Sequence, residues 1–145
     1  MKANRIVLGA VAMLAVGIVA FSTGVSVGQT KEMNNRIYEL RTYTTLPGRL
    51  PALNTRFREH TMKLFEKQGM KNEMYWIPTD DARKDNTLVY VISHASQDAA
   101  DKSWKAFQAD PEWIKVRDAS EADGKILAKA PDRIFMRMTD YSPER

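Results

Sequence analysis

The stretch that decides the fold is residues 36–44, which read Arg-Ile-Tyr-Glu-Leu-Arg-Thr-Tyr-Thr. Side chains alternate here with the period of two that is typical of a β-strand. The alternation puts Glu39 and Arg41 on the same face of the strand as Ile37 and Tyr43. A charged pair on the more crowded face of a strand needs partners, because an unpaired buried charge is costly. Glu39 and Arg41 are therefore the first candidates for a functional site.

The first 28 residues have the layout of a secretory signal peptide. Lys2 and Arg5 precede an uninterrupted apolar run over residues 6–21, and small residues follow. An uncleaved membrane anchor is the alternative, because residues 6–27 form a stretch of about 22 residues and roughly 20 apolar residues cross a bilayer. Basic residues before an apolar run stay on the cytoplasmic side. Both alternatives predict an exported domain, periplasmic or extracellular, that meets the membrane only through this segment.

The composition excludes several kinds of site. The 145 residues include no cysteine, so there are no disulfides, thiolate metal ligands or cysteine nucleophiles. The formal net charge of +4 falls to about +2 without the two basic residues of the leader. Basic and acidic residues are interspersed, whereas nucleic-acid binding requires a clustered basic face. No spacing of histidine, aspartate and glutamate suggests a metal site.

The rest of the chain predicts alternating strands and helices after a polar linker at residues 29–35. The first strand leads into a helix that carries a buried stripe including Phe57, His60 and Leu64 and ends at Gly69. The later elements are strands at 71–79 and 87–94, a helix from residue 97 that restarts at Asp110-Pro111, and a last strand at 133–139.

This order of strand, helix, strand, strand, helix, strand is that of a ferredoxin-like βαββαβ fold. We therefore expect one α+β domain at residues 36–142, with a four-stranded antiparallel sheet covered by helices on one face. The other face must be solvated or meet a partner.

Three motifs, in this order, resemble the NIPSNAP family of small ferredoxin-like domains. They are Tyr38-Glu39-Leu40-Arg41-Thr42-Tyr43, Arg58-Glu59-His60 and Asp110-Pro111-Glu112-Trp113. The resemblance covers about residues 36–140 and implies membership in the dimeric α/β-barrel superfamily, whose members pack two sheets face to face across a twofold axis. It therefore implies a homodimer with a cavity inside the barrel.

In such a barrel the mixed face of the first strand is expected to look into the cavity. The residues concerned are Ile37, Glu39, Arg41 and Tyr43, joined by Arg133, Phe135 and Arg137 of the last strand. We predict that Glu39 pairs with Arg41, Arg137 or their symmetry mates, because enclosed charges must be paired. A carboxylate in a low-dielectric cavity has a raised pKa, so Glu39 could act as a base and Arg41 as an anion clamp. A purely structural ion pair is the alternative.

Aromatic side chains could line a ligand pocket or serve core and interface packing equally well. The aromatic residues considered are Tyr43, Tyr75, Trp76 and Tyr90. The predicted ligand-binding set is therefore Glu39, Arg41, Tyr43, Trp76, Tyr90 and Arg137. Trp104, Phe107 and Trp113 are predicted to be core residues.

His60 and His94 are the only histidines, so any imidazole base or haem ligand must be one of them. Relatives in the superfamily include haem-degrading enzymes, which makes haem a cofactor to test. His60 lies on the predicted buried stripe, where a core or border role competes with a role as ligand or proton shuttle. His94 is predicted to be a partly exposed residue at a strand end.

Three functions remain open at this point. The first is an exported homodimer that binds a small apolar or carboxylate-bearing molecule in its barrel. The second is a cofactor-independent or haem-linked monooxygenase-like enzyme, with Glu39, Arg41 and His60 as candidate catalytic residues. The third is a non-catalytic structural or stress-related interaction module.

Overall fold

The computed structural model describes residues 36–143. In chain order the elements are β1 (Ile37–Thr44), α2 (Leu50–Arg56), the π-helical segment η1 (Phe57–Thr61), α3 (Met62–Lys67), β2 (Lys71–Trp76), β3 (Thr87–His94), α4 (Gln97–Ala109), α5 (Pro111–Ser120) and β4 (Asp132–Met136). The predicted leader and linker lie at residues 1–35, outside the described residues. Within the described range, no helix has the length and apolar character needed to cross a membrane.

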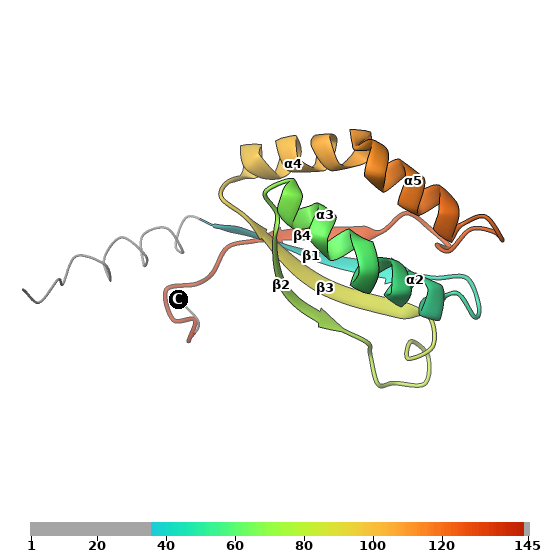
Figure 1. Cartoon of the computed structure of the whole chain (residues 1–145). Helices are drawn as coiled ribbons and strands as arrows, with labels where there is room; N and C mark the ends of the chain where they lie inside the picture. Colours follow the sequence, from blue (N-terminus) through green and yellow to red (C-terminus); the bar gives the residue numbers. More distant parts are fainter. Residues whose placement is uncertain (1–35, 144–145) are drawn as a thin grey trace, which may run out of the picture.

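The four strands form one antiparallel sheet in the order β2-β3-β1-β4. The helices described above all lie on one side of this sheet, as Figure 1 shows. The first strand in the sequence is therefore central, with β3 and β4 on its two sides. The predicted α+β, ferredoxin-like fold is confirmed.

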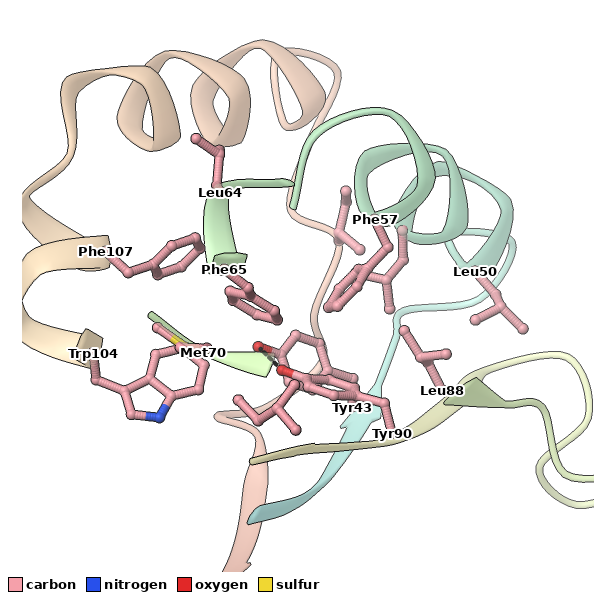
Figure 2. Close-up of a cluster of buried hydrophobic side chains, with 13 residues drawn as sticks. Tyr43, Leu50, Phe57, Leu64, Phe65, Met70, Leu88, Tyr90, Trp104 and Phe107 are labelled. Carbon is pink, nitrogen blue, oxygen red and sulfur yellow. Dashed lines mark hydrogen bonds between the residues drawn. The ribbon is translucent and has the colours of Figure 1, made fainter. Parts of the chain in front are cut away.

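The hydrophobic core fills the space between the sheet and the helices (Figure 2). Aromatic rings dominate it: Phe65 of α3 contacts Trp104 and Phe107 of α4, with ring centroids 5.5 and 5.0 Å apart. Tyr90 of β3 is fully buried beneath them. The core prediction for Trp104 and Phe107 is confirmed, while Trp113 is half-buried and packs against Phe107 from the rim.

The ends of the helices follow the predicted chemistry. Asp110 precedes α5, and its carboxylate accepts a hydrogen bond of 2.9 Å from the backbone N–H of Glu112 while Pro111 occupies the first helical position. Gly69 ends the first helix with φ of +78°, a left-handed conformation that glycine adopts without strain.

The π-helical segment inside the first helix was not predicted, and it changes which residues are buried. One extra residue in the turn rotates the stripe, so that Thr61 is buried and His60 is exposed. The Thr61 hydroxyl donates a hydrogen bond of 3.2 Å to the backbone carbonyl of Arg56, five residues earlier. The prediction that His60 lies on the buried stripe is therefore wrong.

The prediction for the two faces of β1 is also wrong. Glu39, Arg41 and Tyr43 point toward the helices, because Glu39 is hydrogen-bonded to Trp104 of α4 and the Tyr43 ring lies 5.6 Å from that of Phe57. Phe135 and Arg133 share this face as expected, since Phe135 is opposite Glu39 and Arg133 is opposite Arg41. The mixed face of β1 thus lies under the helical layer, and the open face of the sheet carries the other set of β1 side chains.

Candidate functional site

A buried polar cluster lies between β1, β3 and α4; we call its four residues, Glu39, Arg41, His94 and Trp104, the Glu39 cluster. Glu39 Oε1 accepts a hydrogen bond of 2.9 Å from Arg41 Nη1. Its Oε2 accepts one of 2.6 Å from Trp104 Nε1 and lies 3.0 Å from His94 Nε2. Both Glu39 and His94 have no exposed surface. Two strands and a helix are therefore tied together through one carboxylate.

The protonation of the cluster follows from these contacts. Burial by itself would raise the pKa of the Glu39 carboxyl, but hydrogen bonds from His94, Arg41 and Trp104, with the charge of Arg41, outweigh it and lower that pKa. An ionised carboxylate only accepts, so His94 Nε2 carries a hydrogen and donates it to Glu39. The prediction of a raised pKa is wrong, because the site is closed and full of donors.

The Arg41 guanidinium is held by aromatic rings as well as by its counter-charge. Its Cζ lies 4.3 Å from the centre of the Trp104 ring and 5.5 Å from that of Tyr43. The predicted Glu39–Arg41 pair is present within one chain. Two buried nitrogens of the cluster, Arg41 Nε and His94 Nδ1, have no hydrogen-bond partner among the described residues. The cluster is thus held by several contacts, and these two nitrogens are the positions at which it could make further hydrogen bonds.

Two further predicted residues, Tyr43 and Tyr90, lie in the core next to the cluster. The Tyr90 hydroxyl donates a hydrogen bond of 3.2 Å to the Tyr43 hydroxyl. Burial raises the pKa of Tyr90, which keeps its phenol neutral. Tyr75 stacks on Tyr90 with ring centroids 5.2 Å apart. Of the two roles that the sequence left open for these tyrosines, a ligand pocket or core packing, the structure shows core packing.

The other predicted site residues lie elsewhere. Trp76 is 46% exposed on the open face of the sheet, away from the Glu39 cluster. Arg137 is exposed just beyond the end of β4. The His60 side chain is 48% exposed in the helical layer. The structure thus brings together Glu39, Arg41, Tyr43 and Tyr90 and separates Trp76, Arg137 and His60 from them.

His94 and the indole N–H of Trp104 are the polar groups that the sequence interpretation missed. The prediction that His94 is partly exposed is wrong. A signal was available in β3, since His94 follows Leu88, Tyr90 and Ile92 at intervals of two and so shares their buried face. The contact between Trp104 and Glu39 joins residues 65 positions apart and has no such local signal.

His94 is not accessible to a haem iron. Its side chain is fully buried, so neither ring nitrogen reaches solvent, and its Nε2 lies 3.0 Å from Glu39. Within residues 36–143, no three histidine, aspartate and glutamate side chains are grouped to hold a metal ion.

The open face of the sheet carries a hollow of about 300 Å³. Its apolar wall consists of Tyr38, Met74, Trp76, Val91 and Met138. Lys71 and Glu73 also line it and form an ion pair of 3.1 Å, in which the Lys71 side chain is 62% exposed. The face beyond the hollow is apolar too, with Ile134 of β4 58% exposed. A patch of this kind on a sheet face is typical of an interaction or binding surface.

Comparisons with known proteins agree with this architecture. The family model described as NIPSNAP matches residues 38–143. The chain belongs to the NIPSNAP family. The resemblance seen in the three sequence motifs is thereby confirmed. A search of curated protein sequences found no match.

Solved structures show the same fold at low sequence identity. A NIPSNAP family protein of unknown function from Agrobacterium tumefaciens is 19% identical, with a TM-score of 0.63 over 76% of this chain and 94% of that chain. A NIPSNAP-like domain protein from Burkholderia xenovorans is 14% identical, with a TM-score of 0.64 over 76% and 90%. A monooxygenase from Streptomyces coelicolor, solved with the ligand nanaomycin D, is 16% identical, with a TM-score of 0.55 over 79% and 96%.

The alignment covers 94% of the Agrobacterium chain, so that solved protein contains little beyond the fold that it shares with this chain. The experiments below use residues 29–145, which include all of the described residues 36–143.

Proposed function

We propose that this NIPSNAP protein is an exported homodimer that binds a small apolar or carboxylate-bearing molecule between the open faces of two sheets. The observation that carries the proposal is the apolar open face with its hollow of about 300 Å³. Met74, Trp76 and Ile134 are exposed there by 53, 46 and 58%. Burying such side chains against a second copy is favourable, at about 25 cal/mol for each Å² of apolar surface removed from water.

The hollow has the chemistry expected for a small amphiphilic ligand. Trp76, Met74 and Tyr38 provide an apolar wall for the body of the molecule. The Lys71 ammonium, exposed at the same hollow, provides a counter-charge for a carboxylate in exchange for its 3.1 Å ion pair with Glu73. The ligand site therefore moves from the Glu39 face, where the sequence put it, to the opposite face of the same strand.

Catalysis by the Glu39 cluster is not part of the proposal. Neither Glu39 nor His94 lines the hollow on the open face, and both side chains are fully buried. The monooxygenase from Streptomyces coelicolor shares the fold, and fold alone does not carry an activity. The cluster is best explained as a structural tie between the sheet and α4.

Native mass spectrometry of residues 29–145 tests assembly and ligand together. We expect a dimer that carries a reproducible small-molecule adduct when the protein is purified gently from its own host. Trp76→Glu should give a monomer, because it places a charge in the interface. Ile114→Glu is the matched control, since Ile114 is also exposed, at 37%, but lies on α5; it should leave the dimer intact.

The adduct itself is tested by Lys71→Gln, which removes the counter-charge and leaves a polar side chain that is one atom shorter. Loss of the adduct with retention of the dimer is the expected result. A dimer without an adduct would contradict ligand binding, and a monomeric wild-type protein at micromolar concentration would contradict the assembly.

Export is tested separately by N-terminal sequencing of the protein from its host. We expect a new N-terminus close to residue 29. An intact Met1 in a membrane fraction would instead support the uncleaved anchor.

A further inference from the structure

A second hollow lies within the helical layer, between the first helix and α5; we call it the helical groove. It has a volume of about 580 Å³. Ala52 of α2 and Val116 and Ala119 of α5 form its apolar part. Arg56 and Ser120 also line it. The groove therefore combines an apolar wall with a cationic residue, and it contains none of the residues of the open face.

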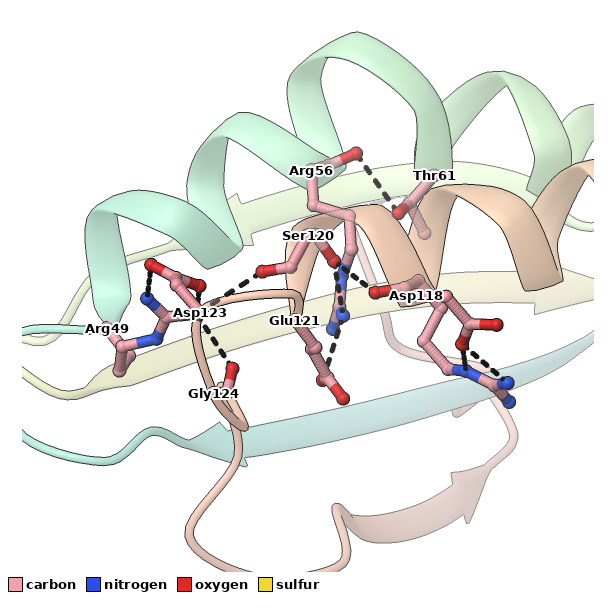
Figure 3. A network of polar contacts seen from close by, with 9 residues as sticks. Arg49, Arg56, Thr61, Asp118, Ser120, Glu121, Asp123 and Gly124 are labelled. Carbon is pink, nitrogen blue, oxygen red and sulfur yellow. Dashed lines mark hydrogen bonds and ion pairs between the residues drawn. The ribbon is translucent and has the colours of Figure 1, made fainter.

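Arg56 is unusual for an arginine on a helix surface, because it is only 3% exposed. Its Nη1 donates to Ser120 Oγ and to Glu121 Oε1, at 3.2 Å in both cases, as Figure 3 shows. Its guanidinium carbon lies 5.3 Å from the centre of the Trp113 ring. Its Nε is buried and has no hydrogen-bond partner among the described residues. One edge of the guanidinium is thus occupied, and the edge that includes Nε is not.

The backbone around Arg56 is shaped by the π-helical segment that follows it. The Thr61 hydroxyl donates a hydrogen bond to the backbone carbonyl of Arg56, which anchors Arg56 at the start of this segment. Segments of this kind occur frequently at functional sites. Glu59 and His60, which belong to the segment and to one of the family motifs, line the same groove.

The end of the groove is fixed by Arg49. Its two terminal nitrogens each donate 2.7 Å hydrogen bonds to the Asp123 carboxylate, and Nη2 also donates to the carbonyls of Ser120 and Gly124 (Figure 3). These bonds hold the C-terminal end of α5 to the start of α2. Arg49 does not line the groove, so it supports the position of Ser120 and leaves recognition to Arg56.

We propose that the helical groove is a second binding site, for a small carboxylate-bearing amphiphile whose carboxylate is held by Arg56. The ligand's carboxylate accepts from the Nε edge of the guanidinium, a planar fork suited to carboxylates. Its apolar body lies against Ala52, Val116 and Ala119. Binding of this kind gives a partner to a buried donor that has none among the described residues, and a buried donor without a partner is costly.

The rim of the groove sets the selectivity. Lys115, His60, Glu59 and Glu112 all line it, so the rim mixes basic and acidic side chains without an excess of positive charge. Glu121, whose side chain is 28% exposed, neutralises the other edge of Arg56. The preference for an anion therefore comes from the single guanidinium of Arg56. The groove should accept a ligand with one carboxylate beside an apolar chain and reject anions with several charges.

Isothermal titration calorimetry of residues 29–145 with octanoate tests this site, with octanol as the uncharged probe of the same length. We expect octanoate to bind more tightly than octanol. Arg56→Gln should weaken octanoate about tenfold or more, the scale of one lost charge-assisted contact, and leave octanol unchanged. Far-UV circular dichroism checks that the variant is folded.

A second variant keeps the test decisive if Arg56→Gln does not fold. Ala119→Trp fills the groove from an exposed position on α5 and should abolish octanoate binding. Ala106→Trp, at an exposed alanine of α4 that does not line the groove, is the matched control and should bind normally. Binding that survives Ala119→Trp would overturn the proposal. If that surviving binding is lost in Trp76→Ala, the octanoate occupies the open face of the sheet instead.

Discussion

Replacing Glu39 by glutamine is the sharpest test of how this fold is held together. The substitution keeps the shape of the side chain but removes the counter-charge of Arg41, which is 9% exposed. Breaking one side of a buried ion pair typically costs 3–5 kcal/mol, because the remaining charge is left uncompensated. Glutamine can still accept from Trp104, so we expect a loss near the lower end, about 3 kcal/mol. That is a large part of a stability of about 5–15 kcal/mol.

Equilibrium unfolding in urea, followed by far-UV circular dichroism, measures this cost. With a urea dependence of about 1–3 kcal/mol/M, the midpoint should fall by about 1–3 M. Asp132→Asn is the matched control, because Asp132 forms a 2.6 Å ion pair with Lys129 in which both side chains are more than half exposed. Exposed pairs contribute little, so its midpoint should barely move.

A double variant identifies the source of the loss. If the cost arises from the uncompensated charge, Glu39→Gln combined with Arg41→Met should be more stable than the sum of the two single effects predicts. A Glu39→Gln midpoint equal to that of Asp132→Asn would refute the reasoning, since the buried contacts would then contribute no more than an exposed pair.

Two further predictions follow from the described contacts. The folded protein lowers the pKa of Glu39 below its usual value of 4.5, so the stability that this carboxylate contributes is present above pH 4.5 and is lost as the pH falls through the lower folded pKa. The difference in unfolding free energy between wild type and Glu39→Gln, measured in urea titrations, should therefore shrink in acid. A difference that stays constant with pH would contradict the assignment. Ser96→Ala removes the side chain that accepts a 3.1 Å hydrogen bond from the backbone N–H of Ala99 at the start of α4, and should cost about 1 kcal/mol in the same assay, whereas no change would mean that water replaces this cap.

The sequence predicted the elements of this domain because their signals are local. The alternation in β1, the glycine at position 69 and the Asp110-Pro111 helix start each depend on residues close together in the chain, and each is found in the structure. The strand at 87–94 is found with the predicted bounds. The order of these elements predicted the ferredoxin-like fold, which the sheet order then confirmed.

The candidate site was predicted less well, because it depends on contacts between distant elements. The pairing of Glu39 with Arg41 spans two residues and was expected, but the Trp104 indole that donates to the same carboxylate lies 65 positions away. Without that donor, a charged face appeared suited to an open cavity and not to the helical layer. His60 was misplaced for a different reason: a single extra residue in the helical turn shifts the phase of every later position, and hydrophobic periodicity does not reveal it.

The alternation in β1 gives this protein two surfaces that can change independently. Glu39 and Arg41 are committed to the tie with α4, whereas Tyr38, Leu40 and Thr42 face the other way and take no part in it. A redesigner could therefore exchange the outward set to recognise another molecule or another partner chain while the inward set continues to specify the same fold. The two faces of one eight-residue strand thus have separate roles, recognition on the outward face and stability of the fold on the inward face.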